Sequence, residues 1–102
     1  MQPPVSAARI QLAQRTGDQL LAFLSGSSKA VPPIWDSLAA QQRAVALRDT
    51  LRATDAVAQD PSWRVAAEDA SLRAGLGAGR HLRAQLVWRD QRWLVSGVAM
   101  EQ

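Results

Sequence analysis

The residues of this sequence with the clearest capacity for chemistry are aromatic and basic, and they lie near its end. Trp88 and Trp93 are interleaved with arginines, of which Arg89 and Arg92 flank residues 90–91. A guanidinium group binds carboxylates and phosphates, whereas an indole ring packs in cores or lines binding surfaces. This combination indicates binding of a protein, a small molecule or a nucleic acid, and it favours a protein that is not an enzyme.

Patterns for catalysis and metal binding are weak. His81 is the single histidine and the chain has no cysteine, so a transition-metal site would need carboxylates around it. Glu68 and Asp69 are adjacent, so in a strand they would point to opposite faces. The glycines of residues 75–80 match neither the dinucleotide-binding fingerprint nor a P-loop, and they predict a turn. We therefore predict no catalytic residues, no metal site and no cofactor.

Residues 80–100 predict a β-hairpin that turns at residues 90–91. Alternation on both sides of the turn sets Trp88 opposite Trp93 and Arg89 opposite Arg92. The tryptophans share a face with Leu86, and we expect helices to bury this face. The arginines then lie on the other face, which reads as a solvated strand surface.

The second strand of this hairpin, 92–100, is expected to be a sheet edge. It contains no proline, and uninterrupted alternation places Leu94, Val98 and Met100 on its outward face. Unprotected edges and apolar outward faces attract other chains. We therefore expect a protein partner or a second copy of the chain at this strand. A strand covered on both sides is the alternative.

Two amphipathic helices are expected before the sheet. Ser6 can cap the first helix, which runs to about Ser25 and carries Gly17 on its apolar side. The second helix follows Trp35, with Asp36 or Ser37 as its cap, and fades between residues 53 and 59. The apolar residues expected on the second helix are Leu38, Val45, Leu47 and Leu51.

Residues 62–74, which include Trp63, are compatible with a strand or a helix, and we favour a strand. The predicted fold is therefore a single α+β domain spanning residues 1–102. Two N-terminal helices pack on a small antiparallel sheet that ends in the 80–100 hairpin. If residues 62–74 are helical instead, the fold becomes three helices plus a hairpin, as in a winged-helix protein.

Length and composition agree with one globular domain. The chain has 102 residues, 47% of them hydrophobic, and a net charge of +3. Eleven arginines and one lysine indicate the coding bias of a GC-rich bacterial genome. No segment reaches the roughly 20 apolar residues of a membrane-spanning helix, and no signal peptide is recognisable, so no membrane insertion is expected. The localisation is left open, since the chain could be a domain excised from an anchored or exported protein.

The order of these elements resembles a known superfamily. The matching features are the apolar run at 20–24, Trp35 beside the second helix, the Trp-Arg-Val of residues 63–65, and the terminal 86–95 segment. The chain resembles the cystatin-like cone fold of the nuclear-transport-factor and ketosteroid-isomerase superfamily. That resemblance implies helices packed on a curved sheet around a cavity, in enzymes and in non-enzymatic assembly domains. Isomerase-type sites use a tyrosine, and this chain has none.

These observations favour a non-catalytic binding or assembly domain, part of a larger envelope or secretion complex. One alternative is a small-molecule-binding or isomerase-like enzyme of the cone fold. The other is a winged-helix nucleic-acid binder, which is disfavoured because Glu68 and Asp69 would lie on its recognition helix. The candidate binding residues are Trp63, Trp88, Arg89, Arg92, Trp93, Leu94 and Val98.

Overall fold

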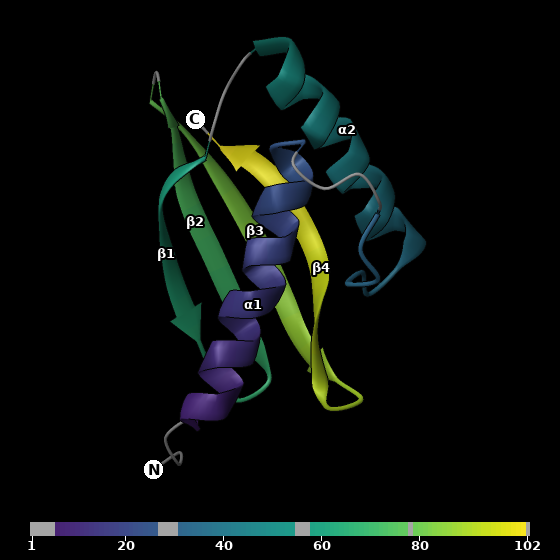
Figure 1. The fold of residues 1–102 in the computed structure, drawn as a ribbon, viewed down its shortest axis with the longest axis vertical. Coiled ribbons are helices and arrows are strands. Elements are labelled where there is room, and N and C mark those ends of the chain that lie inside the picture. Colours follow the sequence, from purple (N-terminus) through teal and green to yellow (C-terminus); the bar gives the residue numbers. More distant parts are fainter. Residues whose placement is uncertain (1–5, 27–30, 55–57, 78, 102) are drawn as a thin grey trace.

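The computed structural model describes residues 6–26, 31–54, 58–77 and 79–101. Its elements follow the chain in the order α1 (Ala7–Leu24), α2 (Leu38–Thr54), β1 (Gln59–Val65), β2 (Asp69–Gly77), β3 (Arg80–Arg89) and β4 (Arg92–Glu101). The four strands form one antiparallel sheet in the order β1-β2-β3-β4. Helix α1 lies across one face of this sheet, and α2 runs beside β4 (Figure 1). The α+β architecture predicted from the sequence is confirmed.

The segment 62–74 is extended, which makes the alternative of a third helix and a winged-helix arrangement wrong. It is, however, two strands rather than one, because the chain reverses at residues 66–68 and Ala66 N–H donates to the carbonyl of Asp69 at 2.8 Å. The apolar alternation of β1 resumes in β2, where Ala70, Leu72 and Ala74 are buried. Burial of these side chains against the helices outweighs the helix propensity of an alanine-rich segment.

Helix α1 begins where the sequence predicts. The hydroxyl of Ser6 accepts a hydrogen bond from the Arg9 N–H at 3.2 Å, so Ser6 is the N-cap. Gly17 lies directly against Trp63 of β1, and a Cβ atom at this position would overlap Cη2 of the indole ring. Glycine therefore permits the close approach of α1 to β1.

Helix α2 packs on β4 and on α1. The Ser37 hydroxyl accepts a hydrogen bond from the Ala40 N–H at 3.2 Å, which identifies Ser37 as the cap. Leu47 and Leu51 are buried as expected. Leu38 was expected on the apolar side, but it is the first residue of the helix and its side chain is 66% exposed.

The β3–β4 hairpin has the predicted register, with Trp88 opposite Trp93 and Arg89 opposite Arg92. Asp90 and Gln91 form its two-residue turn, and both have positive φ, at 51° and 61°. The two indole rings meet edge to face, with centroids 5.3 Å apart. The helix side buries Trp93 to 2% exposure but leaves Trp88 half-exposed, so the expected burial holds fully for only one of the pair.

A β-bulge in β4 changes the predicted faces of this strand. Leu86 pairs with Val95, whereas the preceding Gln85 pairs with Gly97, which leaves Ser96 as the extra residue. The shift by one residue turns Val98 toward the helices, where it joins the core at 8% exposure, and Met100 packs there as well. The expectation of an outward apolar face at Leu94, Val98 and Met100 is wrong, since Leu94 is also buried.

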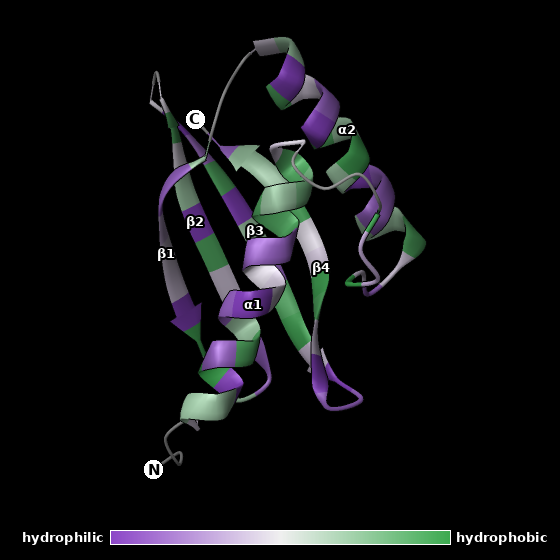
Figure 2. Ribbon diagram, in the orientation of Figure 1, coloured by the Kyte–Doolittle hydropathy of each residue, from purple (hydrophilic) through white to green (hydrophobic). Residues whose placement is uncertain are grey.

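The core occupies the space between the sheet and the two helices. Alternate residues along the strands are hydrophobic and hydrophilic, as Figure 2 shows, so one face is apolar and the other polar. The largest fully buried side chains are Leu20, Phe23, Leu72, Leu82, Leu86 and Val95.

Candidate binding surface

The sheet face opposite α1 carries most of the polar strand residues, and we call it the open face. Strand alternation places the partners of each register row on this same side. Two such rows cross its centre, and their members are Ser62, Arg73, Arg83 and Ala99 in the first and Arg64, Ser71, Gln85 and Gly97 in the second.

A shallow hollow of about 500 Å³ lies on the open face. Its polar lining comes from all four strands and consists of Ser62, Arg64, Ser71, Arg73, Arg83 and Glu101. A neighbouring hollow of about 330 Å³ shares Arg64, Ser71 and Arg83 and extends toward Asp69. Three exposed guanidinium groups and two hydroxyl groups therefore surround one concave area, and both kinds of group can donate hydrogen bonds to an anion.

The arginines of the hollow are close to one another in the sheet. Arg73 lies directly opposite Arg83, and Arg64 is the diagonal neighbour of Arg73 because it pairs with Ser71. Arg83 is held by Glu101, with Nη1 and Oε1 3.3 Å apart. Within the described residues, Arg64 and Arg73 have no ion-pair partner. Like charges directly opposite each other in a sheet are destabilising, so this arrangement has an electrostatic cost.

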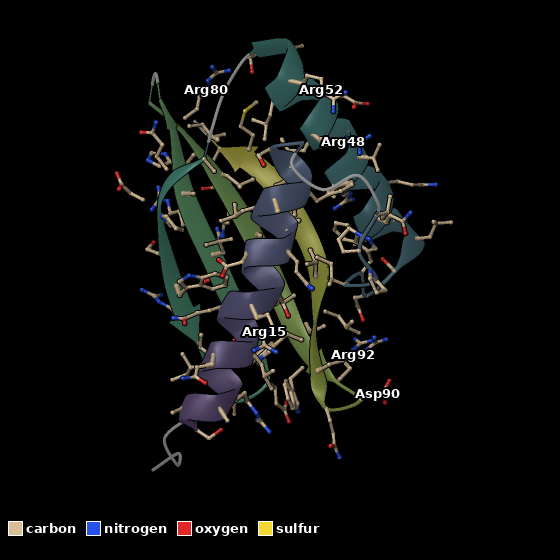
Figure 3. All side chains as sticks on the ribbon, in the orientation of Figure 1. Arg15, Arg48, Arg52, Arg80, Asp90 and Arg92 are labelled. Carbon is tan, nitrogen blue, oxygen red and sulfur yellow. The ribbon has the colours of Figure 1, made fainter. Side chains whose placement is uncertain are left out.

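The predicted arginines, Arg89 and Arg92, lie elsewhere. They stand beside the turn of the hairpin, and Figure 3 shows Arg92 and Asp90 there, at the opposite end of the sheet from Arg80. Arg89 already has a partner, since its Nη1 lies 3.2 Å from Oδ1 of Asp36. These two arginines are therefore at the rim of the sheet rather than in the hollow.

The predicted tryptophans point to the helix side, where they connect elements of the fold. The indole N–H of Trp93 donates to the carbonyl of Arg9 at 2.9 Å. The Arg9 guanidinium lies 4.3 Å from the centroid of the Trp88 ring and donates to the carbonyl of Ala67 at 2.6 Å. Trp63 packs on Gly17. The tryptophans thus join α1, the β1–β2 turn and the hairpin.

The seven residues singled out from the sequence do not form one site. Three tryptophans and Val98 belong to the helix side, Leu94 is buried, and two arginines flank the hairpin turn. The sequence reasoning missed Arg64, Arg73 and Arg83 as a group. Each occupies a polar position of an alternating strand, and recognition of the turn at 66–68 would have placed them on one face.

The two edges of the sheet differ. At the β4 edge, Val95 N–H donates to the Ile34 carbonyl at 2.6 Å, and Asp36 N–H donates to the Val95 carbonyl at 2.9 Å. The chain just before α2 therefore pairs with β4 around Trp35, and α2 packs alongside. Strand β1 forms the other edge, and its residues are mostly exposed.

The described part of the chain offers no cluster of three histidine or acidic side chains that could hold a metal ion. In the same residues, neither helix is long and apolar enough to span a bilayer.

Comparison of the chain with protein-family models, with curated proteins and with solved structures gives no match. The resemblance to the cone-fold superfamily therefore stays a prediction.

Proposed function

We propose that this protein is a non-catalytic binding domain that holds an acidic segment of a protein partner on its open face, within a larger assembly. The observation that carries the proposal is the direct opposition of Arg73 and Arg83 across β2 and β3. Like charges directly opposite each other in a sheet repel, and a carboxylate placed between the two guanidinium groups would relieve this repulsion.

The lining of the hollow suits carboxylates. Guanidinium groups bind carboxylates through two parallel hydrogen bonds. Among the described residues, neither Arg64 nor Arg73 is in an ion pair, so both can make such a contact. Ser71 adds a hydroxyl donor between the arginines, whereas the Ser62 hydroxyl donates to the Arg73 carbonyl at 3.4 Å. Because the surface is shallow and open, it fits a chain segment better than an enclosed small molecule.

A protein partner is favoured over a nucleic acid. Single-stranded nucleic acids bind to surfaces that combine basic groups with aromatic rings on which the bases stack. Trp63 borders the hollow, but its ring lies against Gly17 of α1, and the rings of Trp88 and Trp93 pack on each other on the helix side. The aromatic rings described on these strands are therefore turned away from the open face.

An isomerase-like enzyme receives less support. Such a site would lie in a cavity between the helices and the sheet, and there the side chains of Phe23, Leu82 and Leu86 are fully buried in the core. The polar groups that could do chemistry lie on the other face of the sheet, without a pair of carboxylates facing each other.

The test is binding of a labelled oligoglutamate peptide, followed by fluorescence anisotropy at low and physiological salt. Arg73→Glu should weaken binding by roughly tenfold or more, since it removes a charge-assisted contact and adds a repulsive charge. Arg15→Glu is the matched control, because Arg15 is exposed on α1, where Figure 3 labels it, across the sheet from the hollow. It makes the same change in net charge and should alter affinity less than about twofold.

Equal losses in the two variants would mean that only net charge matters, and the open face would then not be the site. Tighter binding of an oligouridylate of equal length than of the oligoglutamate would replace the protein partner with a nucleic acid.

A further inference from the structure

Among the described strands, β1 has one neighbour, so its outer edge carries backbone groups that no described strand uses. The hydrogen bond from Ala66 to Asp69 closes the β1–β2 turn, and in an antiparallel ladder bonded and non-bonded pairs alternate. The bonded pairs are therefore Arg64 with Ser71 and Ser62 with Arg73. It follows that the N–H and C=O groups of Trp63 and Val65 point away from β2, toward the outer side of the sheet.

One end of this edge is protected. The register of β1 shifts between Gln59 and Ser62, Asp60 has a positive φ of 52°, and Pro61 has no N–H to donate. The remaining residues, 62–65, form a short regular edge that could pair with about four residues of another strand.

The two sides of this short edge differ in chemistry. On the open face it carries Arg64, with Arg73 diagonally behind it on β2. On the helix side it carries Trp63 and Val65, which are half-buried and apolar. A strand placed beside β1 would therefore meet positive charge on one side and apolar surface on the other.

One register of pairing between two copies of this edge is disfavoured by charge. Two β1 strands related by a two-fold axis could exchange hydrogen bonds between Trp63 of one copy and Val65 of the other. That register places Arg64 of both copies directly opposite each other on the open face. In this register a second copy brings a like charge opposite Arg64, whereas an acidic residue of a partner brings the opposite charge.

We propose that the acidic segment of the partner binds as a fifth, antiparallel strand on the edge of β1, with acidic and apolar residues in alternation. The selection of acidic residues rests on the proposed function, whereas the pairing itself rests on the free backbone groups of Trp63 and Val65. In this geometry the apolar residues lie opposite Trp63 and Val65 and direct their own N–H groups toward β1. The acidic residues reach Arg64 and Arg73, and their N–H groups point away.

The test uses a labelled peptide of alternating valine and glutamate, and two versions of it that are N-methylated. Methylation of the valine nitrogens should weaken binding by roughly tenfold or more, because it removes the hydrogen bonds to β1 and adds bulk at the junction. Methylation of the glutamate nitrogens should change affinity less than about threefold, because those nitrogens face solvent in the antiparallel arrangement. A peptide with the same residues in two blocks should bind more weakly than the alternating one.

Substitution in the protein gives an independent readout. Val65→Pro removes an N–H that does not bond to β2, and it should weaken binding of the alternating peptide by roughly tenfold. Val65→Ala keeps the N–H and is the matched control, with a smaller loss expected. Thermal unfolding of both variants checks that the sheet is intact.

Unchanged affinity on methylation of the valines overturns the edge pairing, and so does equal sensitivity to methylation at valine and glutamate. Neither result touches the open-face assignment, which Arg73→Glu decides with the oligoglutamate peptide. A dimer that forms without added peptide and is lost in Val65→Pro would also overturn the selection against a second copy.

Discussion

The two faces of the sheet differ in composition and burial, although the same strands build both. On the helix side, the strands contribute leucines, alanines and Val95, and nearly all are buried. On the open face they contribute serines and arginines, including Arg73 directly opposite Arg83. Apolar burial is the main source of stability in a small domain, so the helix side can stabilise the fold by itself.

This difference separates stability from binding. Because the open face contributes little to the core, it can keep like charges side by side at a modest electrostatic cost. Substitutions on the helix side should therefore reduce the free energy of unfolding, and substitutions on the open face should change affinity instead. The following three predictions test that separation.

The largest effect is expected for Trp93→Ala. Loss of a fully buried indole, together with its hydrogen bond to the Arg9 carbonyl, should lower the free energy of unfolding by about 3–5 kcal/mol. Gln85→Ala on the open face of the neighbouring strand is the control and should cost less than about 0.5 kcal/mol. Urea denaturation followed by tryptophan fluorescence and circular dichroism measures both. A loss below about 1 kcal/mol for Trp93→Ala would show that the helix side does not set stability.

An intermediate effect is expected for Gly17→Ala. The added methyl group would overlap the Trp63 ring, so α1 or the ring must move, at an expected cost of about 1–3 kcal/mol. Trp63→Leu in the same chain should recover part of this loss, and a double-mutant cycle gives the coupling between the two positions. Additive losses would mean that the close approach of α1 to β1 is not what requires glycine.

The smallest effect, and one of opposite sign, is expected for Arg73→Gln. Removing one of two opposed charges should leave stability unchanged or raise it by about 0.2–0.5 kcal/mol, with the gain shrinking as salt is added. The same substitution should weaken binding of oligoglutamate. Thermal unfolding at two salt concentrations measures the change in stability. A clear loss of stability would contradict the inference that the opposed arginines destabilise the domain.

Elements with strong local signals could be predicted from the sequence. Ser6 caps α1 as expected, and the alternation around residues 90–91 correctly sets Trp88 opposite Trp93. These features depend on residues near one another in the chain, where side-chain type and spacing act directly.

The sequence analysis missed two small features, and both determine which residues share the open face. The turn at 66–68 contains no glycine, proline or asparagine, so the sequence does not mark it. The bulge at Ser96 adds a single residue and reverses the faces of everything after it in β4. The meeting of Arg73 and Arg83 depends on the pairing of β2 with β3, which the alternation of either strand alone does not specify. The class of fold could therefore be predicted from the sequence, whereas the arginine hollow could not.

The hydrogen bond between Trp93 and Arg9 joins residues 84 positions apart, and it has a consequence for synthesis. During translation, α1 leaves the ribosome long before β4, so the first helix can pack on α2 and β1 but lacks the β4 part of its cover until the last strand emerges. A nascent chain arrested before residue 92 would present Leu20, Phe23 and the leucines of β2 and β3 without their full cover. Contacts of such long sequence separation slow folding, because the chain must close a large loop before they form. Ribosome-bound intermediates of this protein should accordingly be strong clients for a chaperone that binds apolar segments.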